Sequence, residues 1–449
     1  MFRDHKSWIA AGLAVMVIAA GWVLVSARPE RPQMAEASEA ARRISTGQPQ
    51  LVSIEPLPET DGAMCPVMEA SASASLAAAL QQEAARTRTA GDAGSSGQPA
   101  IPGDRAPVRV IRDTNPTYSA VALDTNTDEV FLEDENLFGI KVFNRTDNTP
   151  PKASFTEPKR VIGGLQTKLE FNCGLYVDPK SGDIYSVAND TVDTLVIFPR
   201  DAQGNVKPMR AINTPHGTFG IAVDEDKHEL FLTVQHEHAL VVYRKEAEGD
   251  EKPLRRLEGN KTQLEDPHGI ALDPGSGLMF VSNHGSTNER QKVGTGRFNP
   301  PSITIYPMTA EGNTAPLRII EGPKTQLDWP AAMAFDPDRG ELYVANDAGN
   351  SLLVFGANDT GDAAPRRVIN GPKTGIRYPT GLYLDRKNRE VWLANMGNHS
   401  ATAYSMDANG NTAPLRTIRS APVEQLALAI GNPGAVAYDS KREEILVPN

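Results

Sequence analysis

PLRIIEGPKTQLDWPAAMAFDPDRGELYVANDAGNSLLVF, residues 316–355, is the stretch that decides the fold of this chain. It contains four short apolar runs, LRII, AAMAFD, ELYVAN and SLLVF, several of which carry β-branched or aromatic side chains. Gly, Pro, Asp and Asn separate the runs, which is typical of strands joined by tight turns. The stretch therefore predicts one four-stranded antiparallel sheet, and this sheet needs neighbours because it cannot bury both of its faces alone.

The same unit recurs about every fifty residues, and self-similarity at such a period is typical of a propeller. Each unit opens with an outer strand announced by Pro-x-Arg, and the arginines are Arg109, Arg160, Arg210, Arg255, Arg318, Arg367 and Arg416. The inner strand that follows ends in an aspartate, at Asp124, Asp178, Asp224, Asp273, Asp336, Asp385 and Asp439. These seven copies predict an all-β, seven-bladed β-propeller of four-stranded antiparallel blades over residues 107–449.

Composition narrows the class of partner. The chain has 449 residues, a formal net charge of −11 and a pI near 5.3. Because a basic footprint is absent, nucleic acid is excluded as a partner class. Charges of both signs are mixed along the sequence, as on an ordinary solvated surface.

The N-terminal segment, residues 1–27, predicts export. Arg3 and Lys6 precede an apolar run from Trp8 to Ala27. The end of this run fits a signal-peptidase site, whereas its length also suits an uncleaved transmembrane helix, and the sequence leaves both readings open. Either reading places the propeller in the periplasm or outside the cell, anchored to the inner membrane if the segment is retained.

Residues 28–106 are rich in Pro, Ala, Ser and Gly and predict a flexible tether with a candidate helix at 70–88.

The seventh repeat lacks two of the four strands that the other repeats contain. We therefore predict a composite last blade made of 51–55, 108–112, 435–439 and 444–449, since closing a ring removes exposed sheet edges; the alternative is a three-stranded last blade. Cys65 in the tether and Cys173 in the propeller are the two cysteines, and whether they pair stays open.

Three stretches carry a family likeness: PHGIALD at 267–273, ELYVAND at 341–347 and NSLLVF at 350–355. They resemble the NHL family of propellers, and the likeness covers residues 107–449. Asn often replaces the second Asp of the family pattern, and Pro-x-Arg is unusually regular. The chain is also similar to a wider group of exported propellers that includes lactonases, streptogramin lyases and peptide-amidating lyases. The resemblance implies a fold more specifically than an activity.

The Asp and Arg of every repeat are predicted to be structural, because a group present in every blade cannot mark one site. We expect the Asp side chains to accept backbone N–H groups in turns, and the Arg side chains to face solvent or carboxylates of neighbouring blades. The position that opens each inner strand differs between repeats and should face the mouth of the central channel. Its candidate ligand-binding residues are Ser119, Cys173, Phe219, His268 and Thr380.

Six of the eight histidines are expected on the face at which the inner strands begin, which we call the loop face. Imidazole is a common metal ligand and a base near neutral pH. The candidate ligands of a divalent metal ion, zinc or calcium, are His268, His284, His216 and His236. The candidate acid–base residues are Glu237 and Glu289. Of these histidines only His268 sits where the lyase resemblance implies one, and the alternative is that polar loops collect histidines.

Repeat four also carries an insertion at 285–301 on the loop face. It is either a lid or partner surface, or a surface loop without a function.

The sequence leaves two functions open for the protein. The first is an exported, non-enzymatic binding or scaffold module that presents its loop face to a protein or small-molecule ligand. The second is a metal-dependent lyase or hydrolase with a histidine site at the channel mouth. We favour the first, and the sequence leaves an enzymatic activity open.

Overall fold

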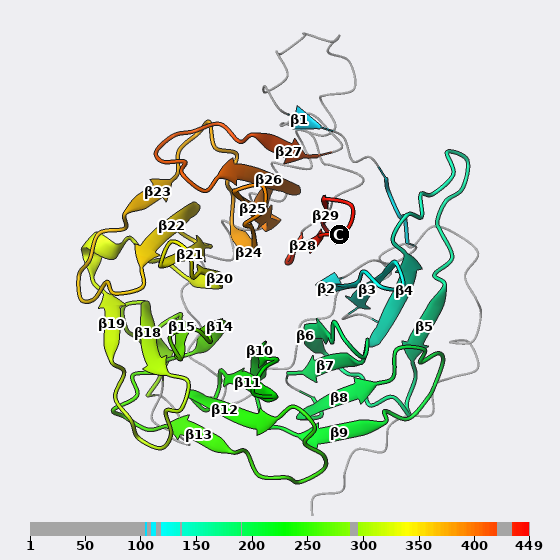
Figure 1. Cartoon of the computed structure of the whole chain (residues 1–449), viewed down its shortest axis with the longest axis horizontal. Coiled ribbons are helices and arrows are strands. Elements are labelled where there is room, and N and C mark those ends of the chain that lie inside the picture. Colours follow the sequence, from blue (N-terminus) through cyan, green and yellow to red (C-terminus); the bar gives the residue numbers. More distant parts are fainter. Residues whose placement is uncertain are drawn as a thin grey trace, which may run out of the picture. The chain divides into compact units, whose positions relative to one another are not determined.

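The computed structural model describes residues 104–105, 109–113, 118–134, 137–189, 191–287, 295–419 and 433–448. The chain divides into two units, Met1–Ser96 and Gly97–Asn449, and all described residues belong to the second. In this unit antiparallel sheets are arranged around a central axis, as Figure 1 shows. Short 3-10 helices, η2 (Pro323–Thr325) and η3 (Met396–Asn398), lie between strands. The unit is a β-propeller.

Six sheets have four consecutive strands of one motif, ordered from the inner to the outer edge. Blades one to three are β2 (Tyr118–Asp124), β3 (Glu129–Asp134), β4 (Gly139–Asn144), β5 (Arg160–Gly163); β6 (Asn172–Val177), β7 (Ile184–Ala188), β8 (Thr194–Phe198), β9 (Arg210–Asn213); and β10 (Thr218–Asp224), β11 (Glu229–Val234), β12 (Ala239–Arg244), β13 (Arg255–Glu258). Blades four to six are β14 (Pro267–Asp273), β15 (Leu278–Asn283), β18 (Ser302–Pro307), β19 (Arg318–Glu321); β20 (Pro330–Asp336), β21 (Glu341–Asn346), β22 (Ser351–Gly356), β23 (Arg367–Ile369); and β24 (Pro379–Asp385), β25 (Glu390–Asn395), β26 (Ser400–Ser405), β27 (Arg416–Ile418).

The core lies between neighbouring blades. The two middle strands of a blade, such as β7 and β8, are buried along their whole length, because both faces of the sheet are covered by the adjacent blades. One apolar cluster joins Tyr185 and Leu195 of blade two to Leu230 and Val241 of blade three. Burying a side chain of this size contributes roughly 1.5–3 kcal/mol, so each blade is stabilised by its neighbours rather than by itself.

The prediction of seven blades is wrong, because the described residues form six four-stranded blades. The seventh copy of the motif forms a two-stranded sheet of β28 (Ala437–Asp439) and β29 (Glu444–Leu446), and β28 lies against β2 and β24. Among the described residues no further strand pairs with β29. The recurring Asp marks an inner strand, and an inner strand defines a four-stranded blade only where three more strands follow it.

The composite last blade is likewise corrected. Residues 109–113 are not a strand, and β1 (Asp104–Arg105) pairs in parallel with β27 of blade six. Nevertheless Arg109 donates to Glu444 at 2.9 and 2.7 Å, so this segment contacts the start of β29. The predicted strand at 51–55 lies outside the described residues. The ring is therefore closed by side-chain contacts and a short parallel pair.

Four Pro-x-Arg arginines bind a carboxylate of their own blade, not of a neighbouring one: Arg160, Arg255, Arg367 and Arg416. Arg210 and Arg318 instead donate to backbone oxygens of the next blade. Arg255 donates to both oxygens of Glu229 at 2.8 and 2.7 Å, and Arg367 binds Glu341 at 2.8 and 2.6 Å. Such bidentate pairs fix the outer strand across the sheet. Arg109 also contacts both oxygens of Glu444, although with a single nitrogen, Nη1, so the pairing of this Arg with a Glu is kept where residues 109–113 form no strand.

The opposite end of the strands, where each inner strand turns into its neighbour, is called the turn face. The recurring aspartates accept backbone N–H groups there as predicted: Asp178 Oδ1 accepts from Lys180 at 2.7 Å, and Asp439 Oδ1 accepts from Lys441 at 2.9 Å. Lys245 of blade three reaches back to Asp178 of blade two at 2.6 Å. The turn face thus carries a repeated polar network that also links blades.

Each inner strand is irregular near its start, where the pairing with its neighbour shifts. A Cβ on Gly220 would lie 2.4 Å from the His268 carbonyl oxygen, and one on Gly269 would lie 2.3 Å from that of Ala331. The glycines are required because the backbones of adjacent blades approach closely around the axis. This close approach also fixes the residue that precedes each glycine, including His268.

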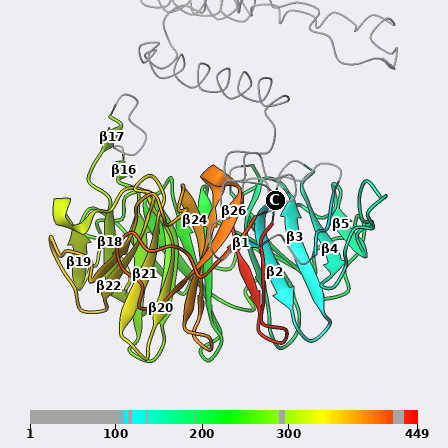
Figure 2. The same ribbon diagram turned by 90° about the horizontal axis from the view of Figure 1, so that it is seen from above.

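Within the described part of the chain no helix is long and apolar enough to cross a membrane. The expected export segment at 1–27, the tether with its helix at 70–88, and Cys65 lie outside the described residues. The described parts of the insertion form a short hairpin, β16 (Ser286–Thr287) and β17 (Arg297–Phe298). Figure 2 shows this hairpin standing above the ring, on the side away from the turn between β20 and β21.

Candidate functional site

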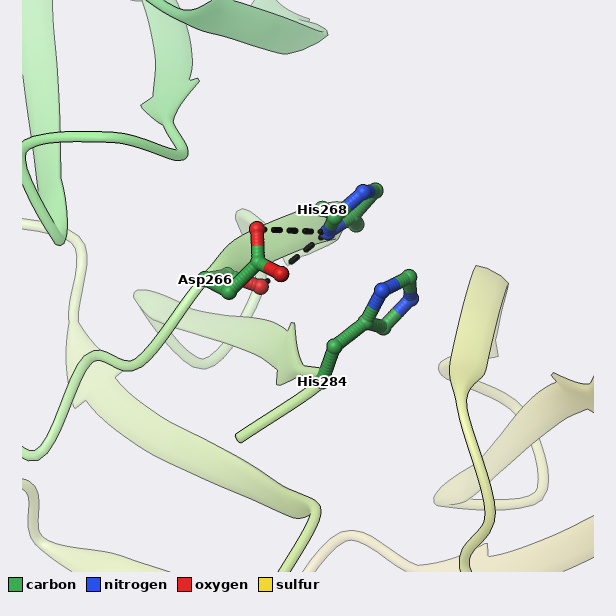
Figure 3. Close-up of side chains that lie close together, drawn as sticks. All are labelled: Asp266, His268 and His284. Atoms are coloured by element: carbon green, nitrogen blue, oxygen red, sulfur yellow. Dashed lines mark hydrogen bonds and ion pairs between the residues drawn. The ribbon is translucent and has the colours of Figure 1, made fainter. Parts of the chain in front are cut away.

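Three side chains that carry metal-binding or acid–base chemistry lie together on the loop face of blade four. Asp266 directly precedes β14, His268 is the second residue of that strand, and His284 directly follows β15; Figure 3 shows the three side chains together. Their ligand atoms all lie within 4.8 Å of one another. Because Pro267 pairs with Asn283 across the sheet, the two segments are held side by side at this point.

Hydrogen bonds fix His268 on both sides of its ring. Nδ1 lies 3.0 Å from the backbone oxygen of Asp266 and 3.5 Å from a carboxylate oxygen of the same residue. Nε2 contacts the side-chain amide of Gln235, which follows β11 of blade three. His268 therefore connects blade four to blade three, and its ring has little freedom to rotate.

The backbone around the cluster is also held in place. Asp266 has a φ of 56°, in the left-handed region that Asp tolerates better than most residues. The amide of Glu265 donates to the Asn283 side chain at 3.0 Å. The insertion contributes as well, because Asn299 Nδ2 donates to Glu265 Oε1 at 2.7 Å and Gly285 N donates to Glu265 O at 3.1 Å. The base of the insertion thus braces the two segments that carry Asp266 and His284.

Four rings form a row across three blades. The Phe219 ring lies 4.8 Å from His268, the His268 and His284 rings stack at 3.6 Å and 16°, and His284 stacks on Trp329 at 5.0 Å and 19°. The row starts at the half-buried Phe219 and ends at Trp329, which is 49% exposed. It therefore leads from the channel side of the loop face to a solvent-exposed aromatic surface.

Burial sets the protonation of the cluster. It lowers the pKa of His268, although the Asp266 carboxylate opposes the shift. Burial and the adjacent His268 lower the pKa of His284 to about 3. Burial raises the pKa of Asp266, although His268, His238 and His236 counteract it. Both imidazoles are consequently neutral at pH 7, so each ring carries one lone pair. On His268, Nδ1 faces acceptor oxygens of Asp266 and carries the proton, so the lone pair on Nε2 faces the Gln235 amide.

The structure brings together two of the predicted metal ligands, His268 and His284. His216 instead lies 2.9 Å from Asp193, and its ring contacts that of His236 at 5.0 Å. The carboxylate Asp266 was missed by the sequence interpretation. It stands two residues before His268 in the same short segment, and this spacing was the available signal, although only the turn before β14 decides that both side chains face His284.

The other predicted site residues have contacts of their own. Glu237 pairs with Arg256, and Glu289 lies outside the described residues. Ser119 Oγ donates to the Asn172 backbone oxygen at 2.8 Å, and Thr380 Oγ1 donates to Pro433 O at 3.3 Å. Cys173 Sγ lies 3.6 Å from the Val187 and Thr218 oxygens. Ser119, Thr380 and Cys173 therefore reach the next blade or sheet around the axis.

No protein-family model matches the chain, and no curated protein matches it. Among solved structures it is similar to hydrazine synthase of Kuenenia stuttgartiensis, with a TM-score of 0.50 and 10% sequence identity, over 79% of this chain and 97% of that chain. At this identity the likeness shows the fold alone. Fold and comparison together define a β-propeller protein, and membership of the NHL family stays a prediction.

Proposed function

We propose that this propeller is a binding module whose loop face holds a protein partner through exposed aromatic side chains. Five of the six exposed aromatic side chains in the described residues lie on the loop face: Phe138, Phe171, Phe298, Trp329 and Tyr378. The sixth, Phe155, lies between β4 and β5 on the turn face. An apolar rim of this kind around a ring is typical of interaction surfaces.

The observation that carries the proposal is the backbone beneath these rings. Phe171, Trp329 and Tyr378 each stand directly before an inner strand with φ of 30°, 52° and 44°, in the left-handed region. The equivalent residues of blades three and four are Gly217 and Asp266, which adopt this conformation more cheaply. Side chains that are both exposed and strained are not explained by stability, and such positions cluster at ligand-binding sites.

The ring row supports a defined position on this face. Trp329 is held by His284 from below, so its orientation is fixed before a partner arrives. Aromatic side chains that are already ordered bind with little loss of conformational entropy. The finer parts of the proposal, export to the periplasm and an NHL-type relationship, rest on the sequence alone.

The proposal is tested with the double variant Trp329→Asn and Tyr378→Asn, because Asn accepts the left-handed backbone and removes both rings. Immobilised wild-type chain and variant are compared for the proteins they retain from an extract of the cells that produce them. Binding of a retained partner to each protein is then measured by calorimetry. We expect the partner to be lost from the double variant.

The matched control is Leu254→Asn with Leu317→Asn, which removes two exposed apolar side chains at the starts of outer strands near the turn face. This control is expected to retain the partner with unchanged affinity. Equal retention by all three proteins, or loss only in the control, contradicts the assignment of the loop face.

A further inference from the structure

We propose that Asp266, His268 and His284 form a binding site for one divalent transition-metal ion of the zinc or iron(II) type. The proposal does not rest on the binding module: a metal site is compatible with partner binding, with catalysis, or with a purely structural role. It extends the sequence expectation by replacing a set of histidines from two blades with a mixed set of two imidazoles and one carboxylate from a single blade.

The donor set fits such an ion. Two imidazole nitrogens and one carboxylate oxygen are the protein ligands of many zinc and iron(II) sites that keep further positions open. Calcium prefers a shell of oxygen ligands, so the two nitrogens disfavour it. His268 Nδ1 and the Asp266 carboxylate are 3.5 Å apart. Two ligands of a tetrahedral ion at about 2.1 Å are separated by roughly 3.4 Å, so the spacing of this pair suits an ion once Nδ1 gives up its proton and its hydrogen bond to the Asp266 backbone oxygen.

His284 supplies the third donor. Its side chain is 9% exposed, its ring stacks on that of His268 at 3.6 Å, and Figure 3 shows that Nδ1 is the ring nitrogen that faces Asp266 and His268. A buried ring nitrogen costs free energy unless a partner satisfies it. The three donor atoms lie within 4.8 Å, so side-chain rotation of about an ångström brings His284 into the coordination distance given above.

The surroundings favour coordination over chance proximity. Residues around the cluster act as supports: Asn283 and Asn299 hold Glu265, and the chain through Glu265 positions Asp266. Outer contacts of this type orient metal ligands in known sites. The insertion belongs to the blade that carries all three ligands.

The test uses the full chain produced without a histidine tag and titrated with Zn²⁺ alone by calorimetry. Co²⁺ is used as a second probe, because its visible absorption reports the ligands bound to it. We expect one equivalent to bind to the wild type. Asp266→Asn, which keeps the left-handed backbone, and His284→Gln should each weaken binding by about a hundredfold or more, since even supporting residues contribute about ten- to a hundredfold.

The matched control is His228→Gln. His228 lies on the turn face, is exposed, and contacts the carboxylate of Glu246 at 2.7 Å, so it tests whether any histidine–carboxylate pair binds the probe. Its affinity should stay within about twofold of the wild type. Asn299→Ala, which acts only through Glu265, should weaken Zn²⁺ binding by about tenfold and shift the Co²⁺ absorption.

The proposal is overturned if the wild type binds no equivalent of either ion, or if His284→Gln binds with unchanged affinity and an unchanged Co²⁺ spectrum. Thermal unfolding of each variant distinguishes loss of the site from loss of the fold. Partner retention by His284→Gln is measured in parallel. Metal loss with full partner retention leaves the binding module intact, and partner loss from the Trp329 variant with full metal content leaves the metal site intact.

Discussion

The two faces of the ring differ in what their side chains do. On the turn face the same groups recur: an Asp that caps a turn, a Glu that pairs with the outer-strand Arg, and cations such as Lys245 that reach the preceding blade. On the loop face equivalent positions hold Phe171, Gly217, Asp266, Trp329 and Tyr378. Repetition therefore marks the residues that assemble blades, whereas departures from the repeat mark the residues available for binding.

The effect of these residues on the free energy of the folded state also differs between the turn face and the loop face. A paired carboxylate on the turn face lowers the free energy of the folded state, because it satisfies a buried arginine. An exposed aromatic residue in a left-handed backbone raises that free energy, because L side chains with bulk rarely adopt this conformation. A protein keeps such a residue at the expense of stability only if another property depends on it. Three variants test this division, from the largest expected effect to the smallest.

The largest effect is expected from Glu129→Gln on the turn face. Burial opposes ionisation, but ion pairs with Arg160 and Lys159 hold the pKa of Glu129 at about 2, below its ordinary value of 4.5. Removing the carboxylate leaves Arg160 buried and unpaired, so unfolding in urea at pH 7 should show a loss of about 3 kcal/mol. The lowered pKa means that this stabilisation is present above pH 4.5 and is lost as the pH falls towards 2.

Its matched control is Glu237→Gln on the loop face, which removes one of the two carboxylates that pair with Arg256, the other being Glu258. Both side chains of that pair are more exposed than those of Glu129 and Arg160. Loss of this pair should therefore cost at most about 1 kcal/mol. Equal losses from the two substitutions would mean that the repeated pairs contribute no more than an ordinary surface pair, and the contrast between the faces would fail.

A smaller effect, an increase in the free energy of unfolding, is expected from Asp347→Asn on the loop face. Burial, together with the Asp328 carboxylate, raises the pKa of Asp347 from 3.8 to about 6. A raised carboxyl pKa favours the folded state below pH 3.8, and this contribution is lost as the pH rises through 6. The variant should be more stable than the wild type by about 1 kcal/mol at pH 7, after discounting for partial exposure.

At pH 4 the same pair of proteins should unfold at nearly equal temperatures, because Asp347 is then mostly protonated in the wild type. Asp328→Asn provides the control, since it removes the second cause of the shift and should reproduce part of the gain at pH 7. A gain that is the same at pH 4 and pH 7 would show that the carboxylate is not the origin of the effect.

The smallest effect on stability is expected from Trp329→Asn. Its ring is half-exposed and its φ of 52° suits Asn better, so the lost contact with His284 and the relieved strain nearly cancel. The free energy of unfolding should change by no more than about 0.5 kcal/mol, while partner binding is lost. A loss of several kcal/mol would show that Trp329 is part of the core, and the loop face would lose its main argument.

Much of the architecture could be predicted because the motif is local. Pro-x-Arg, the terminal Asp and the apolar runs each act within one blade or between neighbours, so their spacing indicated the propeller and the role of the aspartates. The number of blades was wrong for a related reason. A local motif identifies an inner strand, but whether β28 and β29 acquire further partners depends on segments remote in the sequence, such as the one that carries Arg109.

The sequence by itself determined the fold class, the repeat and the residues that hold a blade together, since these depend on period and composition. Only the tertiary structure decided that blades number six, that Arg109 reaches Glu444, and that Asp266 joins His268 and His284. The physical reason is that a site of this kind needs side chains from two separate segments of the blade to meet. Their meeting depends on the left-handed turn before each inner strand and on the close approach of adjacent blades, neither of which a residue's identity specifies alone.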